Sequence, residues 1–326
     1  MKKLIKSLSS LQVRVLTAIY LLVLFSAAIG SLIFLPKIIS VTESSFLVSS
    51  NSKGFNSSQV TEKSETKKSV TTIKSKDLPL PSFTASAVLA KDLQTGEILY
   101  EKNIHNKLAP ASTTKIMTAL VAVEYFKPAD VLIVYSEALV GGSTMGLNVG
   151  EQLSFRSLLY GMMLNSGNDA AFTIASNFPG GVEGFVSQMN KKVQDLKLRS
   201  THFDNPAGFD SSNHFSSAAD LSVISEEVIR NYQLARVVAT KETSVSAWDK
   251  STSHTLKNLN KLLAEEGMLG IKTGFTEKAG ESFVGLVERN GRKVLTVVLN
   301  SNDRFKETKD LIDWVYKNYS WQEVYQ

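Results

Sequence analysis

The chain has 326 residues, of which 43% are hydrophobic and 21% are charged, and it contains no cysteine. This length allows one large or two small globular domains, and the absence of cysteine excludes a disulfide framework. The net charge of +5 is uneven: residues 1–14 carry four basic residues and no acidic one, residues 37–77 carry seven lysines and four acidic residues, and the remainder is therefore −2. Nucleic-acid binding, which requires a basic face on the folded part, is not predicted.

An apolar segment without charged residues extends from residue 15 to residue 36. It has the length of a helix that spans a bilayer, and the basic residues before it predict a cytoplasmic N-terminus. We therefore expect residues 1–14 in the cytoplasm, one transmembrane anchor at 15–36, and the rest of the chain outside the cell membrane. A cleaved signal peptide is the alternative, because Ser26-Ala27-Ala28 offers a cleavage site. Cleavage there would leave an exposed apolar tail, so we favour an uncleaved anchor.

Residues 37–78 are rich in Ser, Thr and Lys and have no sustained apolar period, which predicts a flexible linker. The folded domain is then expected at 79–326. Within it the sequence predicts helices at 112–126, 155–164, 170–178, 182–196, 218–231, 234–238 and 304–319, and strands at 86–89, 97–100, 131–135, 269–273, 282–288 and 293–300. Helices between an early hairpin and late antiparallel strands indicate one α+β unit with a helical insertion.

A serine and a lysine, Ser112 and Lys115, stand three residues apart at the start of an amphipathic helix. Residues at this spacing share one face of a helix, so the hydroxyl and the amine can meet. A serine is a weak nucleophile until a neighbouring base removes its proton, and a lysine is a base only when it is neutral. The same spacing recurs twice in the expected linker, so the pair alone does not identify a site.

Two further motifs follow Ser112 and Lys115 in chain order. Ser166 and Asn168 lie at an expected break between two helices, where a hydroxyl and an amide can point into a cleft. Lys272-Thr273-Gly274 occurs once, at the end of an expected strand, and its glycine permits a ligand to approach the backbone closely. These three motifs in this order are typical of class A β-lactamases and penicillin-binding proteins.

Over residues 85–319 the chain resembles the low-molecular-mass penicillin-binding proteins that are serine-type D-alanyl-D-alanine carboxypeptidases. Besides the three motifs, the stretches closest to that family's usual sequence are 95–103, 110–120, 165–171, 201–206 and 270–280. The resemblance implies a β-lactamase/transpeptidase-like α+β fold. In that fold a five-stranded antiparallel sheet flanked by helices lies beside an all-helical lobe.

The resemblance also implies roles for the motif residues. Ser112 would attack the carbonyl between two D-alanines and form an acyl-enzyme, with Lys115 as the base. Burial and the nearby Lys272 would keep the Lys115 amine neutral. Ser166 would relay a proton to the departing amine, and Asn168 would hold Lys115 and the substrate amide.

The same resemblance implies how the end of the substrate is bound. Lys272 and Thr273, beside Gly274, would contact the terminal carboxylate, and Arg304 would bind that carboxylate as well. The backbone N–H groups of the nucleophile and of Phe275 would form the oxyanion hole. Phe275 occupies a position that is often polar in the family, and a surface position at a helix start is the alternative for Arg304.

The expected function is removal of the terminal D-alanine from peptidoglycan stem peptides, with β-lactam antibiotics as covalent inhibitors. A D,D-endopeptidase acting on cross-links is the main alternative, and a β-lactamase or a non-catalytic envelope-binding module are the others. No cofactor is expected, and the four histidines lack metal-ligand spacing, so we expect His202 and His214 to be structural. The better-known members carry a C-terminal β-rich domain and a C-terminal membrane helix, whereas this chain is expected to be anchored by its N-terminal segment.

Overall fold

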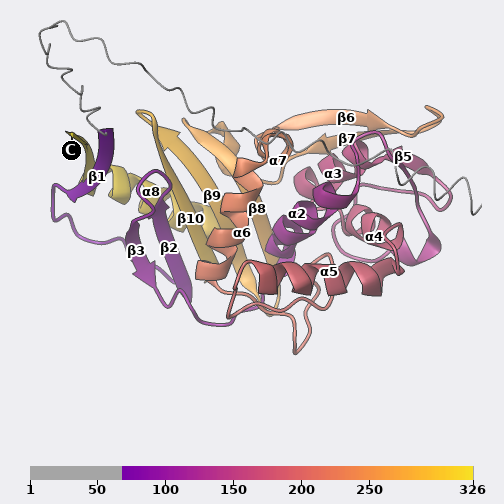
Figure 1. The fold of residues 1–326 in the computed structure, drawn as a ribbon, viewed down its shortest axis with the longest axis horizontal. Coiled ribbons are helices and arrows are strands. Elements are labelled where there is room, and N and C mark those ends of the chain that lie inside the picture. Colours follow the sequence, from indigo (N-terminus) through magenta and orange to yellow (C-terminus); the bar gives the residue numbers. More distant parts are fainter. Residues whose placement is uncertain (1–67, 326) are drawn as a thin grey trace, which may run out of the picture. The chain divides into compact units, whose positions relative to one another are not determined.

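The computed structural model describes residues 68–325, which are drawn in colour in Figure 1. The expected cytoplasmic segment, the expected transmembrane anchor and most of the expected linker lie outside the described residues. Within the described part, no helix is both long enough and apolar enough to cross a membrane.

A five-stranded antiparallel sheet lies at the centre of the fold, with the strand order β3-β2-β10-β9-β8. Its strands are β2 (Ala87–Asp92), β3 (Ile98–Lys102), β8 (Met268–Thr276), β9 (Gly280–Arg289) and β10 (Arg292–Ser301). Both expected hairpins, β2–β3 and β9–β10, are confirmed. Strand β8, which carries the Lys-Thr-Gly motif, is an edge strand, so one side of its backbone is free to face the helices beside it.

Different helices cover the two faces of the sheet, α6 (Ala218–Arg230) on one face and α8 (Arg304–Asn318) on the other. Successive residues of a strand point to opposite faces, and the neighbours Val297 and Val298 of β10 accordingly belong to two different hydrophobic cores. The run of apolar residues in β10 therefore follows from burial on both faces.

The remaining helices lie beside β8 (Figure 1), and they are α2 (Lys115–Tyr125), α3 (Phe155–Leu164), α4 (Asn168–Ser176), α5 (Gly181–Asp195) and α7 (Tyr232–Val238). Three short 3-10 helices complete the set: η2 (Ala111–Thr114), η3 (Ser136–Ala138) and η4 (Lys261–Ala264). The predicted helices are confirmed, α3 with the same bounds. Ser154 stops α3 from extending backwards, because its hydroxyl accepts the N–H of Ser157 as a cap.

Three two-stranded ribbons accompany the main sheet. They pair β1 (Lys68–Lys74) with β11 (Tyr319–Tyr325), β4 (Val131–Ile133) with β5 (Gln152–Ser154), and β6 (Glu242–Ser246) with β7 (Ser253–Lys257). Of these six strands only β4 is expected from the sequence. The region beside β8 is therefore not purely helical, because it includes the short ribbons β4–β5 and β6–β7.

Strand β1 shortens the expected linker, which we had extended to residue 78. All seven of its residues pair with β11, at the other end of the chain. The segment after β1 is also fixed, since the N–H of Ser75 donates to the carbonyl of Asn318 at 2.7 Å and the N–H of Leu78 donates to Oδ1 of Asn318 at 2.9 Å. The sequence gives no sign of this strand because it is polar and its partner is distant in sequence.

Candidate active site

Ser112 and Lys115 meet at the start of the first lobe helix. Ser112 lies in η2, and Lys115 is the first residue of α2 and is fully buried. The Lys115 amine is 3.0 Å from Oγ of Ser112, 2.7 Å from Oδ1 of Asn168 and 2.7 Å from the carbonyl of Ala207. A neutral amine has two N–H groups and one lone pair. Donation to Asn168 and Ala207 leaves the lone pair directed at the Ser112 hydroxyl.

The surroundings of Lys115 favour that neutral form. Burial lowers its pKa well below the usual 10.5, and repulsion from Lys272 lowers this pKa further. Asp169 opposes the shift by attraction, because it favours the charged amine. The Asp169 carboxylate is itself occupied by backbone N–H groups, including those of Met145 and Leu147. Lys115 therefore has the electrostatic setting of a general base.

Ser166 and Asn168 lie at the break between α3 and α4, as the sequence predicts. Ser166 is 3% exposed and has a left-handed φ of 59°, which reverses the chain between the two helices. Gly167 has no space for a side chain, since a Cβ there would lie 2.8 Å from Oδ1 of Asp169. The Asn168 amide donates to the carbonyl of Gly141 at 2.8 Å, which fixes its Oδ1 toward Lys115.

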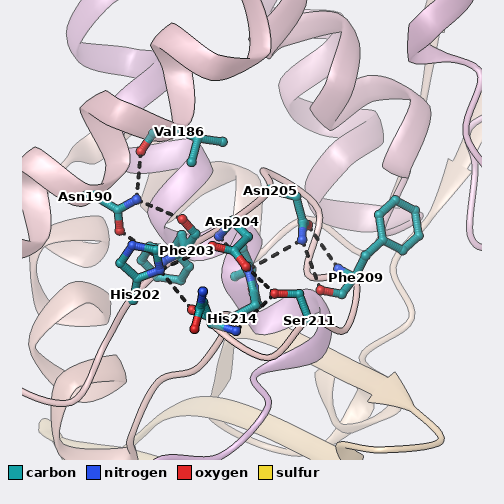
Figure 2. Close-up of polar contacts among 11 residues, drawn as sticks. Val186, Asn190, His202, Phe203, Asp204, Asn205, Phe209, Ser211 and His214 are labelled. Atoms are coloured by element: carbon teal, nitrogen blue, oxygen red, sulfur yellow. Dashed lines mark hydrogen bonds and ion pairs between the residues drawn. The ribbon is translucent and has the colours of Figure 1, made fainter.

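The loop that provides the Ala207 carbonyl is drawn in Figure 2. Oδ1 of Asn205 accepts the N–H groups of Ala207, Gly208 and Phe209, at distances of 2.7–3.1 Å, and so holds the turn. Gly208 packs so closely that a Cβ there would lie 1.9 Å from the carbonyl oxygen of Ala111. Ala207 is absent from the predicted site, because a backbone carbonyl has no side-chain signal. Only the family-like stretch at 201–206 pointed to this loop.

His214 joins this loop to the helix start. Its Nδ1 accepts the N–H of Asp204 at 3.0 Å, so Nε2 carries the proton and donates to Oγ1 of Thr114 at 2.8 Å. Burial lowers the pKa of His214 to about 4. His202 lies at the loop surface, where its Nδ1 is 2.8 Å from the carbonyl of Asn213 (Figure 2). Both histidines contact this loop, and neither has Ser112 as a hydrogen-bond partner.

Strand β8 brings the third motif to the nucleophile. Lys272 is 2% exposed, and burial together with repulsion from Arg304 lowers its pKa to about 7. A Cβ on Gly274 would lie 3.1 Å from the carbonyl oxygen of Pro110 and 3.2 Å from the backbone nitrogen of Ser112. The glycine therefore allows the strand to lie against the Ser112 turn, and the buried Thr273 stands between Lys272 and that contact.

Arg304 is the first residue of α8 and reaches the same strand. Its Nη1 donates to the carbonyl of Gly274 at 2.7 Å, and its backbone N–H donates to Glu281 at 2.9 Å. Its Nε is buried and has no partner among the described residues. Arg304 thus belongs to the site and not to the free surface. Phe275, next along β8, is 60% exposed.

The comparison with known families decides the classification. The model of the family described as peptidase S11, D-alanyl-D-alanine carboxypeptidase, matches residues 71–303. The chain belongs to this family. Among D-alanyl-D-alanine carboxypeptidases, DacF of Bacillus subtilis is 32% identical over 251 residues, which cover 74% of this chain and 64% of the relative. DacD of Salmonella typhimurium is 32% identical and is covered to 66%. The chain thus spans about 65% of the length of these curated relatives.

A D-alanyl-D-alanine carboxypeptidase of Streptomyces sp. K15 is 34% identical and is covered to 82%, with 68% of this chain aligned. The crystal structure titled Streptomyces K15 DD-transpeptidase has a TM-score of 0.70, with 29% identity, and the match covers 74% of this chain and 100% of that one. The expected transpeptidase-like α+β fold is confirmed by this match. In residues 68–325, no three His, Asp or Glu side chains are grouped as a metal site requires.

Proposed function

We propose that this member of the D-alanyl-D-alanine carboxypeptidase family is a serine-type enzyme that removes the terminal D-alanine of peptidoglycan stem peptides. The observation that carries the proposal is the fully buried Lys115 amine, 3.0 Å from Oγ of Ser112 and hydrogen-bonded to Asn168 and Ala207. A buried amine with one free lone pair aimed at a hydroxyl is the arrangement that nucleophilic catalysis by serine requires.

In the proposed acylation step, the Lys115 lone pair takes the Ser112 proton while Oγ attacks the carbonyl carbon of the penultimate D-alanine. The backbone N–H groups of Ser112 and Phe275 stabilise the oxyanion that forms. Collapse of this intermediate breaks the C–N bond, and the departing amine receives a proton through Ser166. Water then hydrolyses the ester on Ser112, which restores the enzyme and releases the shortened peptide.

The proposed site for the terminal carboxylate is formed by Lys272, Thr273 and Arg304. Lys272 and Arg304 are cations close enough for each to affect the other, and the unpartnered Nε of Arg304 is a donor without an acceptor. Binding of a carboxylate would relieve the repulsion between the two cations. β-Lactam antibiotics, which carry a carboxylate beside a reactive amide, are proposed to acylate Ser112 in the same way.

The test is release of D-alanine from a stem pentapeptide by the purified protein, with Ser112→Ala as the control variant. The proposal expects release by the wild-type chain and none by the variant. Folded wild-type protein that releases no D-alanine would contradict it.

Transfer to an amine is the second candidate, because the structural match described above is titled a DD-transpeptidase. The acyl-enzyme on Ser112 is common to hydrolysis, transpeptidation and the endopeptidase reaction, which differ in the acceptor or the donor. Adding an amine acceptor to the pentapeptide assay, and replacing the pentapeptide by cross-linked muropeptides, separates the three. Slow release of bound penicillin is expected for a peptidase, whereas rapid hydrolysis would favour a β-lactamase, and failure of the folded protein to bind penicillin would favour a non-catalytic module.

The proposed location is the outer face of the cell membrane, with residues 15–36 as the single transmembrane anchor. The charge-free apolar stretch after a basic N-terminus supports this proposal. Resistance of the full-length protein to alkaline extraction from membranes, lost when residues 1–36 are deleted, is the expected result. Equal extraction of both forms would contradict the anchor.

A further inference from the structure

A second cavity lies between α3 and α7, at the opposite end of α3 from Ser166. Its volume is about 190 Å³. The side chains that line it include two arginines and two tyrosines; the full set is Pro128, Arg156, Tyr160, Tyr232, Gln233, Arg236 and Val237. None of these lining residues is acidic. The site described above uses none of them.

The two arginines are arranged alike. Cζ of Arg156 lies 5.8 Å from the ring centroid of Tyr160, and Cζ of Arg236 lies 5.7 Å from that of Tyr232. Each pair is four residues apart on one helix, so each helix presents one cation and one ring on a shared face. Within residues 68–325 neither arginine forms an ion pair, whereas Arg230 on the neighbouring helix pairs with acidic side chains.

Gln233 adds an observation of a different kind. Its Nε2 is buried, and it has no hydrogen-bond acceptor in the described part of the chain. A buried donor without an acceptor is unfavourable, and an acceptor-rich ligand in the cavity would remove that cost. The cavity therefore combines cationic donors and an unsatisfied amide donor without any lining carboxylate.

We propose that this cavity binds a phosphate group, free or as a phosphate ester. Guanidinium groups bind phosphate oxygens in pairs, and two guanidiniums with an amide offer more N–H groups than the two oxygens of a carboxylate accept. The volume suits one phosphate with few further atoms. The rings of Tyr160 and Tyr232, the second of which is 76% exposed, give the carbon part of an ester an apolar surface at the mouth.

The test is isothermal titration calorimetry of the full-length protein with inorganic phosphate, glycerol 3-phosphate and acetate. We expect one saturable phosphate site that binds acetate more weakly. Each of Arg156→Gln and Arg236→Gln should weaken phosphate binding by roughly tenfold, as loss of a charge-assisted hydrogen bond does. Arg199→Gln, which removes an exposed arginine outside the cavity, is the matched control and should change nothing.

The cations of the candidate active site provide a second control, because Lys272 and Arg304 could also hold an anion. Phosphate binding retained in Arg304→Gln but lost in the Arg156/Arg236 variants supports the cavity. Binding that follows Arg304, that is unchanged in the cavity variants, or that is as tight for acetate would overturn the proposal. Tighter binding of glycerol 3-phosphate than of phosphate assigns an ester as the ligand, and the reverse order assigns the free ion. Unchanged melting temperatures show that the variants are folded.

Discussion

The amine of Lys115 donates to the backbone carbonyl of Ala207 at 2.7 Å, across 92 residues of sequence. Together with the bond to Asn168, this contact uses both N–H groups of a neutral amine and leaves its lone pair for Ser112. The loop that carries Ala207 is therefore part of the proposed catalytic machinery, although none of its side chains touches Ser112 through a hydrogen bond.

Asn205→Ala tests the role of this loop. The change removes the oxygen that accepts the N–H groups of Ala207, Gly208 and Phe209. We expect a loss of about 1–3 kcal/mol in the free energy of unfolding and a slower acylation by penicillin, because the Ala207 carbonyl is no longer held toward Lys115. Asn213→Ala, an exposed position in the same loop, is the control. An acylation rate equal to that of the wild type would remove the loop from the machinery.

Gly274→Ala tests the close approach of strand β8 to the nucleophile. The added Cβ would lie 3.1–3.2 Å from atoms of Pro110, Ala111 and Ser112, so either the strand or the turn must shift. We expect penicillin acylation to fall by about tenfold or more, because misplacement by a fraction of an ångström impairs a positioned nucleophile. Gly141→Ala, where no atom lies within 4 Å of the added Cβ, should acylate normally. Normal acylation by both variants would contradict the close contact.

The bond between His214 and Thr114 predicts a measurable coupling. His214→Leu and Thr114→Val each leave a buried polar group unpaired, at a cost of about 1–3 kcal/mol in the free energy of unfolding. The double variant removes both partners, so its cost should be smaller than the sum of the single costs by roughly 1 kcal/mol. Combining Thr114→Val with His202→Leu, which has no bond to Thr114, should be additive. Additivity in both cycles would show that the bond contributes nothing.

Lys272 predicts how stability depends on pH. Its pKa is lowered from 10.5 to about 7 in the folded state, so between these values the unfolded chain binds more protons than the folded chain. Raising the pH through this window must therefore favour the folded state, by at most about 1.4 kcal/mol per pH unit from this residue. Urea denaturation at pH 7, 8 and 9 measures the slope. Lys272→Met should flatten it, and the exposed Lys127→Met should not; equal slopes would contradict the shift.

The pairing of β1 with β11 predicts an effect of truncation. A chain that begins at residue 79 lacks β1 and the contacts of Ser75 and Leu78 with Asn318. We expect its melting temperature to fall by roughly 5 °C relative to a chain that begins at Ser64, because a loss of about 1–2 kcal/mol has that effect at this size. Equal melting temperatures would mean that β1 does not stabilise the domain.

Local patterns predicted most of the fold. The helix at Phe155–Leu164 has the bounds expected from its apolar spacing and its serine cap, and the β9–β10 hairpin follows from the Asn290-Gly291 turn. Strand β1 could not be predicted, because its residues are polar and its partner β11 lies at the other end of the chain. The ribbon β6–β7 is short and mostly exposed, so it lacks the buried alternation that identifies a strand.

The same division applies to the site. Side chains with a distinctive chemistry, such as Ser112, Lys115 and Lys272, could be selected from their motifs, and the structure brings them together. The carbonyl of Ala207 could not be selected, because every residue has a carbonyl and only the folded chain determines which one reaches Lys115. Arg304 required the fold as well, since its contact with Gly274 joins a helix start to a strand 30 residues earlier.

The central claim is that Ser112 is the nucleophile and that Lys115 activates it. Intact-mass spectrometry after incubation with penicillin, followed by peptide mapping, measures this directly. We predict a mass increase equal to one penicillin molecule on the peptide that contains Ser112, no adduct in Ser112→Ala, and acylation slowed by at least about a hundredfold in Lys115→Met. A folded wild-type protein without an adduct, or an adduct on a different residue, would contradict the account.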